Sequence, residues 1–118
     1  MKKSIIILVS FLINSSYIIA QTPTLQWQKT LGGTLEDMAS TIIQTSDGGY
    51  LTVGYSYSSD GNVTLNHGVQ DYWVVKLNAT GTIEWQKSLG GSDEDTPTSV
   101  VQTTDGGYAV AGFTASTD

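Results

Sequence analysis

The fold is decided by a stretch that occurs twice: Trp27-Gln28-Lys29-Thr30-Leu31-Gly32-Gly33 returns 58 residues later as Trp85-Gln86-Lys87-Ser88-Leu89-Gly90-Gly91. A second stretch returns with the same offset, Gln44-Thr45-Ser46-Asp47-Gly48-Gly49-Tyr50 as Gln102-Thr103-Thr104-Asp105-Gly106-Gly107-Tyr108. Aligning residues 27–60 with residues 85–118 gives 17 identities in 34 positions without a gap. A fixed period of this length is the sequence signature of a protein built from repeated structural units.

Each period predicts four short strands. Residues 40–45 and 50–57 are rich in β-forming residues and flank Asp47-Gly48-Gly49, which supplies the positive-φ positions of a tight hairpin. Residues 72–78 and 82–89 form a second such pair around the turn Asn78-Ala79-Thr80-Gly81. No stretch after residue 20 shows a sustained helical period, so we expect an all-β fold.

Four strands in such a period are typical of a β-propeller blade. We expect residues 21–118 to form tandem four-stranded antiparallel repeats of 58 residues, arranged as propeller blades. These residues hold about 1.7 periods, whereas a propeller needs at least about four blades, so the expectation is an incomplete propeller and an N-terminal fragment of a longer protein. The alternative is a small β-sandwich of about seven strands, which would use further strands near 25–31, 99–103 and 107–114.

The first twenty residues predict a secretory signal peptide. Lys2 and Lys3 precede an apolar run over residues 5–13, and Ala20 is a small residue at the expected cleavage point. Nine residues span about 14 Å as a helix, roughly half of a bilayer core. We therefore expect a signal peptide over residues 1–20 and an exported protein from Gln21 onward, secreted or on the outer cell surface. An N-terminal anchor or a buried helix is the alternative.

The composition excludes several classes of function. The 118 residues contain no cysteine, which excludes disulfides, thiolate metal sites and cysteine nucleophiles. The net charge of −6 argues against binding to a nucleic-acid backbone, which needs a basic surface. We expect no nucleic-acid partner, and no stable membrane insertion once the signal peptide is removed.

Positions filled alike in both repeats are expected to be structural, because a propeller needs a catalytic constellation only once. Glu36-Asp37 recurs as Glu94-Asp95, with Asp93 in front of the second pair. Adjacent carboxylates suit an acid–base pair or a hard cation, but neighbours on a strand point to opposite faces. We therefore expect Asp37 and Asp95 to accept hydrogen bonds from turn amides.

The connection over residues 58–70 carries the candidate metal ligands. Oxygen-bearing residues stand at positions 1, 3, 5, 7 and 12 of a calcium-binding loop: Asp60, Asn62, Thr64, Asn66 and Asp71. The loop departs from that template at Leu65, where a glycine is expected, and a solvated connection is the alternative reading. His67 is the only histidine, which leaves no conventional transition-metal site. We expect no catalytic residue and no cofactor, with calcium as the open alternative.

Three motifs together resemble a known repeat: Trp85-Gln86-Lys87-Ser88-Leu89-Gly90-Gly91, Asp71-Tyr72-Trp73-Val74-Val75-Lys76-Leu77-Asn78 and Asp105-Gly106-Gly107-Tyr108-Ala109-Val110-Ala111-Gly112. They are similar to the repeat of secreted bacterial β-propeller-like proteins of the Bacteroidetes type, which often carry a type IX secretion sorting domain. That domain is absent from these 118 residues, and the resemblance covers essentially residues 21–118.

The resemblance implies a secreted or cell-surface repeat scaffold rather than a named activity, and because the sequence offers no catalytic constellation we expect it not to be an enzyme. Such a module binds or supports by presenting its blade loops to a protein or glycan ligand, and neighbouring repeats of the same polypeptide or another copy are its structural partners. One alternative is a fragment of an extracellular glycan-processing propeller enzyme, for which the non-repeated residues Asp93 and His67 are the only candidates. The other is a calcium-stabilised surface adhesin that uses the loop over residues 60–71.

Overall fold

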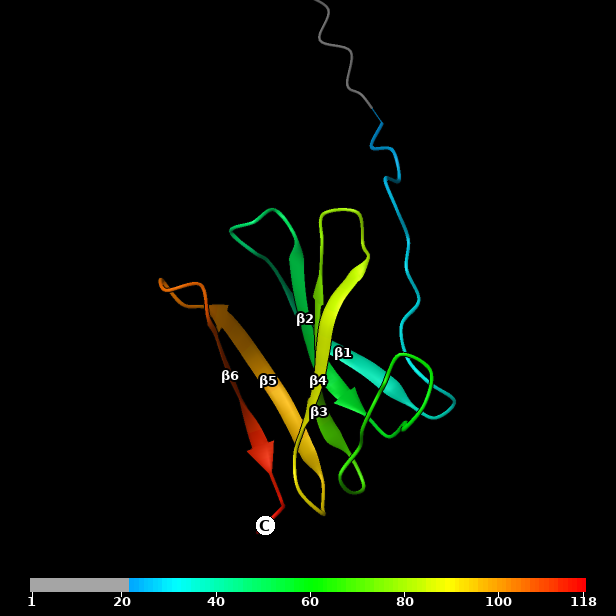
Figure 1. Cartoon of the computed structure of the whole chain (residues 1–118), viewed down its shortest axis with the longest axis vertical. Coiled ribbons are helices and arrows are strands. Elements are labelled where there is room, and N and C mark those ends of the chain that lie inside the picture. The colour runs from blue at the N-terminus through cyan, green and yellow to red at the C-terminus, as the bar shows by residue number, and fades with distance from the viewer. Residues whose placement is uncertain (1–21) are drawn as a thin grey trace, which may run out of the picture.

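The computed structural model describes residues 22–118, which form six β-strands and no helix (Figure 1). The strands are β1 (Asp37–Gln44), β2 (Tyr50–Ser56), β3 (Asp71–Leu77), β4 (Ile83–Leu89), β5 (Asp95–Gln102) and β6 (Tyr108–Thr114). The all-β class predicted from the sequence is confirmed. The signal peptide predicted over residues 1–20 lies outside the described residues, and residues 22–118 hold no helix able to cross a membrane.

The strands form two antiparallel sheets. β1, β2, β3 and β4 make one sheet in the order of the chain, and β5 and β6 make a second, two-stranded sheet. Each sheet is open, because the outer edges of β1, β4, β5 and β6 are not joined into a closed barrel or ring within residues 22–118. Within each sheet consecutive strands are hydrogen-bonded neighbours, the common arrangement in antiparallel sheets.

The tight hairpins form where the sequence predicts them. Gly48 and Gly106 have φ angles of +82° and +87°, in the left-handed region that glycine adopts without steric cost. Gly81 has a φ of +79° in the turn between β3 and β4. In the first turn the amide of Gly48 donates to the carbonyl of Thr45 at 2.9 Å, and in the second the amide of Gly106 donates to that of Thr103 at 3.0 Å.

The second sheet reproduces the geometry of β1 and β2 at the sequence offset of 58. β1 pairs with β2 from Asp37↔Ser56 to Gln44↔Tyr50, and β5 pairs with β6 from Asp95↔Thr114 to Gln102↔Tyr108. Both pairs have the register shift at the same place, between residues 39 and 41 in the first and 97 and 99 in the second. β1 begins at Asp37, three residues before the strand start predicted from the sequence, because its pairing with β2 continues past the bulge to Asp37↔Ser56.

Both faces of the four-stranded sheet are covered. On one face Leu51, Val53 and Val74 pack against Val100 of β5, so the second sheet lies on the first. On the opposite face a separate cluster packs against the segment that precedes β1: Val63, Trp73, Val75 and Leu77, with Trp27 and Leu31 from that segment. The first face is closed by the chain that follows the sheet, and the second by the chain that precedes it (Figure 1).

Residues 25–31 do not form a strand, although the sandwich alternative requires one there. Their counterparts in the second repeat belong to β4, which is hydrogen-bonded to β3 through a hairpin. Residues 25–31 have no such partner strand in the described chain and are instead held by packing and by Trp27, whose Nε1 donates to the carbonyl of Ala79 at 3.1 Å. The structure therefore has six strands rather than seven.

Candidate functional site

The middle of the connection between β2 and β3 packs against the four-stranded sheet. Val63 is 1% exposed and belongs to the apolar cluster around Trp73 and Val75. Gly61 has a φ of +63° and lies so close to the preceding segment that a Cβ there would be 2.4 Å from the carbonyl oxygen of Gly32. The connection therefore has a fixed base, and its outer part, residues 64–69, is exposed except for Asn66, which is half-buried.

The five candidate calcium ligands bond to different parts of the chain. Asp60 Oδ1 accepts from the amide of Thr34 at 2.8 Å, and Asn62 Oδ1 accepts from the amide of Gly32 at 3.3 Å. The oxygens of the other three take partners elsewhere: Thr64 accepts from Gln86, Asn66 from the amide of Gly68, and Asp71 from the amide of His67. In the structure these oxygens accept hydrogen bonds from neighbouring parts of the chain and so hold the connection in place. Calcium binding stays a prediction.

His67 and Asp71 form a pair at the entrance to β3. His67 Nδ1 lies 2.5 Å from Asp71 Oδ2, and the same oxygen accepts from the His67 amide at 2.9 Å. The Asp71 side chain is fully buried, whereas that of His67 is 39% exposed. Within residues 22–118 the hydrogen bonds of His67 are all to Asp71, so the pair has a histidine and a carboxylate but no serine bonded to the ring.

The second oxygen of Asp71 points toward a buried acidic position. Asp71 Oδ1 has no hydrogen-bond partner among the described residues, and Asp95 is only 3% exposed. A Cβ on Gly90 would be 2.8 Å from Asp71 Oδ1 and 2.5 Å from Asp95 Oδ2, so both oxygens lie close to the bare glycine and to each other. No group of three or more histidine, aspartate or glutamate side chains in residues 22–118 is placed to hold a metal ion.

The recurrent acidic residues have structural partners. Asp37 Oδ2 accepts from the amide of Gly33 at 2.8 Å, and Asp95 Oδ2 accepts from the amide of Gly91 at 2.9 Å, which confirms the predicted contacts to turn amides. Glu36 instead accepts from the hydroxyl of Tyr55 at 3.0 Å, so the two adjacent carboxylates have separate partners. Burial raises the pKa of Asp95, but hydrogen bonds from Thr114, Gly91 and Ser116 outweigh it and leave that pKa below its ordinary value.

Three exposed side chains stand on the outer part of the connection. Leu65 is 56% exposed, Val69 is 48% exposed, and the His67 side chain lies between them in the sequence. Loops on a rigid scaffold often carry binding residues, and a rigid base limits the entropy lost on binding. The sequence pattern pointed to the polar residues here, marked Leu65 only as a departure from the calcium template, and gave Val69 no role, although both stand among polar neighbours.

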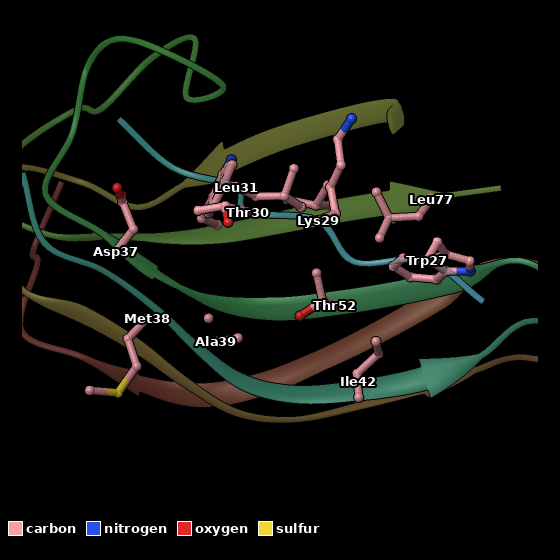
Figure 2. Close-up of a pocket in the computed structure, with 13 residues that line it drawn as sticks. Trp27, Lys29, Thr30, Leu31, Asp37, Met38, Ala39, Ile42, Thr52 and Leu77 are labelled. Carbon is pink, nitrogen blue, oxygen red and sulfur yellow. The ribbon is translucent and has the colours of Figure 1, made fainter. Parts of the chain in front are cut away.

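A hollow of about 420 Å³ lies on the sheet face that carries the segment before β1. Figure 2 shows Trp27 next to Leu77, with Lys29 and Leu31 along the same segment and Ile42 and Met38 on β1 across the hollow. Ile42 is 58% exposed and Met38 is 50% exposed, so β1 is the uncovered side of the hollow. The hollow is mainly apolar and carries no converging acid–base pair.

Lys76 is a buried cation that the sequence pattern did not predict. Its Nζ lies 2.9 Å from Asp47 Oδ2 and 2.8 Å from Glu84 Oε2, and its side chain is 3% exposed. Hydrogen bonds from Thr45 and Lys76 hold the pKa of Asp47 far below its ordinary value. Lys76 therefore joins the turn after β1 to β4 across the end of the sheet.

Comparison of the chain with protein-family models, with curated proteins and with solved structures finds no significant match.

Proposed function

We propose that this chain is part of a secreted or cell-surface repeat scaffold in which four-stranded sheets stack face to face as propeller blades do. It acts as a non-catalytic binding or structural module, and the connection over residues 58–70 is its recognition loop. The N-terminal pattern of residues 1–20 supports export.

The observation that carries the proposal is that the contact between successive units occurs twice. Trp27 lies edge-on to Tyr50 with ring centroids 5.6 Å apart, and 58 residues later Trp85 lies tilted on Tyr108 at 6.0 Å. In both cases the tryptophan belongs to the stretch that ends one period and the tyrosine opens the second strand of the next. A contact repeated at the period of the sequence is what a stack of equivalent units requires.

The polar contacts repeat with the same offset. Thr34 donates its amide to Asp60 Oδ1 at 2.8 Å, and Ser92 donates its amide to Asp118 Oδ1 at 2.9 Å. A hydrogen-bonded aspartate also lies in the turn of each of these two hairpins, where Thr45 bonds to Asp47 and Thr103 to Asp105. Because these hydrogen bonds occur in both repeats, they are structural. We therefore expect binding to depend on residues that take no part in them.

The recognition loop is proposed from its own geometry. Its base at Val63 is buried, and Leu65 and Val69 project into solvent. The test is a binding screen of the chain against bacterial surface polysaccharides and extracellular matrix proteins. A Leu65→Ser/Val69→Ser variant should lose the binding found, and Ile42→Ser, equally exposed but on the sheet, should keep it.

Binding that survives the loop substitutions would contradict the proposed recognition loop. Hydrolysis of any polysaccharide in the screen would favour the glycan-processing enzyme instead.

A calcium-stabilised adhesin is a second candidate, and the observation that favours it is Asp71 Oδ1. A buried carboxylate oxygen without a partner carries a desolvation cost that a bound cation offsets. The adhesin predicts that millimolar calcium raises the midpoint of thermal unfolding and that a chelator reverses the rise. An unchanged midpoint in both conditions would exclude this candidate.

A further inference from the structure

The outer edge of β6 lacks a strand that its counterpart possesses. β2 is hydrogen-bonded to β1 on one edge and to β3 on the other, whereas β6 is bonded to β5 alone among residues 22–118. The two strands have the same length and the same register with their first partner. The seven residues of β6 therefore offer a full edge of backbone donors and acceptors for another strand.

The turn before β6 contains Asp105, which lacks the lysine partner that its counterpart Asp47 has. Asp47, before β2, meets the buried Lys76 of β3 at 2.9 Å. Asp105, before β6, has the same threonine and glycine partners as Asp47, with Gly107 N at 3.1 Å, but no lysine contacts it in the described chain. An extended segment that brings a lysine to Asp105 would restore the arrangement seen at β2.

A glycine in the same turn leaves room for that segment. A Cβ on Gly49 would lie 2.3 Å from the carbonyl oxygen of Leu77 and 2.7 Å from Lys76 Nζ, so the end of β3 requires glycine there. Its counterpart Gly107 is exposed, and a Cβ on it would approach only Thr103 and Asp105 of its own turn. The space that the end of β3 fills at Gly49 is thus open at Gly107.

We propose that the β6 edge, Asp105 and Gly107 form a docking site for a β-hairpin with the sequence pattern of β3–β4. The register follows from the β2–β3 pairs Leu51↔Lys76 and Val53↔Val74. Shifted by one period, the lysine of the incoming strand stands opposite Ala109 and reaches Asp105, while its central valine stands opposite Ala111. The inference rests on the proposed stacking of repeats and names the segment that pairs with the free edge of β6 among the described residues.

The test uses the chain together with a synthetic peptide that has the sequence of residues 70–89. Hydrogen–deuterium exchange should slow at the amides of β6 when the peptide is added, and exchange at the outer edges of β1 and β4 should stay unchanged. A peptide carrying Lys76→Gln should dock about two- to five-fold more weakly, the range expected for one partly exposed ion pair. Asp105→Asn in the chain should weaken the unmodified peptide by the same factor, and Asp93→Asn, an equal change of charge elsewhere, should not weaken it.

The outcomes separate this inference from the proposed function. No slowing at β6, equal slowing at every sheet edge, or docking indifferent to both Asp105→Asn and Lys76→Gln would overturn the docking site, whatever the loop variants show in the binding screen. Dimerisation of the chain alone, measured by light scattering and abolished by Asp105→Asn, would overturn the hairpin as occupant in favour of a second copy. Failure of the loop variants with successful docking would overturn the recognition loop alone.

Discussion

Two neighbouring valines on β5 give the sharpest test of how the sheets pack. Val100 is 6% exposed and packs against Leu51, Val53 and Val74, whereas Val101 is 58% exposed on the other face of the same strand. Valine to alanine removes two carbons, worth about 0.8 kcal/mol each when fully buried. Scaled by burial, Val100→Ala should cost about 1.5 kcal/mol before any cavity is counted, and Val101→Ala about 0.7 kcal/mol.

Urea unfolding followed by tryptophan fluorescence measures both costs. The two variants share the strand and the change in β-propensity, so the difference between them, about 1 kcal/mol or more with the cavity, reports burial against the first sheet. Equal costs, or a larger cost for Val101→Ala, would refute the packing of β5 on the four-stranded sheet.

Further predictions concern the turns and the charged groups. Gly48→Ala should cost about 1 kcal/mol in urea unfolding, because its φ is +82° and a Cβ there touches nothing. Lys76→Met should raise the pKa of Asp47 toward its ordinary value in an NMR titration, and the pKa of Asp105 should not follow. The lowered pKa of Asp95 makes its contribution to stability complete above the ordinary value of 3.8 and lost as the pH falls below it, so Asp95→Asn should flatten the acid decline of the thermal midpoint.

Each of these has a clear contrary result. A Gly48→Ala variant as stable as the parent would contradict the left-handed turn. If Lys76→Met shifted the pKa of Asp47 and the pKa of Asp105 equally, the ion pair between Lys76 and Asp47 could not be the cause of the shift. An acid decline that is unchanged in Asp95→Asn would place its cause in other carboxylates.

Local patterns predicted the strands and turns well because those depend on neighbouring residues. Asp-Gly-Gly between β-forming runs requires positive φ, and both turns have it at Gly48 and Gly106. The stretch at residues 25–31 shows the limit of local patterns. Its sequence matches that of β4, but it has no hydrogen-bonded neighbour in the described chain, and strand formation depends on such a neighbour.

The candidate site was predicted less completely, because spacing along a chain does not say where each oxygen points. The alternation of Asp60, Asn62 and Thr64 fits a metal loop, yet in the structure these residues fasten the connection to the segment before β1 and to β4. The approach of Asp71 to Asp95 joins residues 24 positions apart across two strands. No pattern within either strand indicates that contact.

The most direct test of the stacked-repeat proposal is to lengthen the chain by one period. A second copy of residues 61–118 added after Asp118 keeps the period intact, because Asp118 is the counterpart of Asp60. The copy supplies a β3-type strand to the edge of β6 and covers the exposed face that carries Val101 and Phe113. The extended chain should unfold in one cooperative transition at a higher urea concentration than the parent. Two separate transitions, or a midpoint equal to that of the parent, would contradict the stacking of repeats.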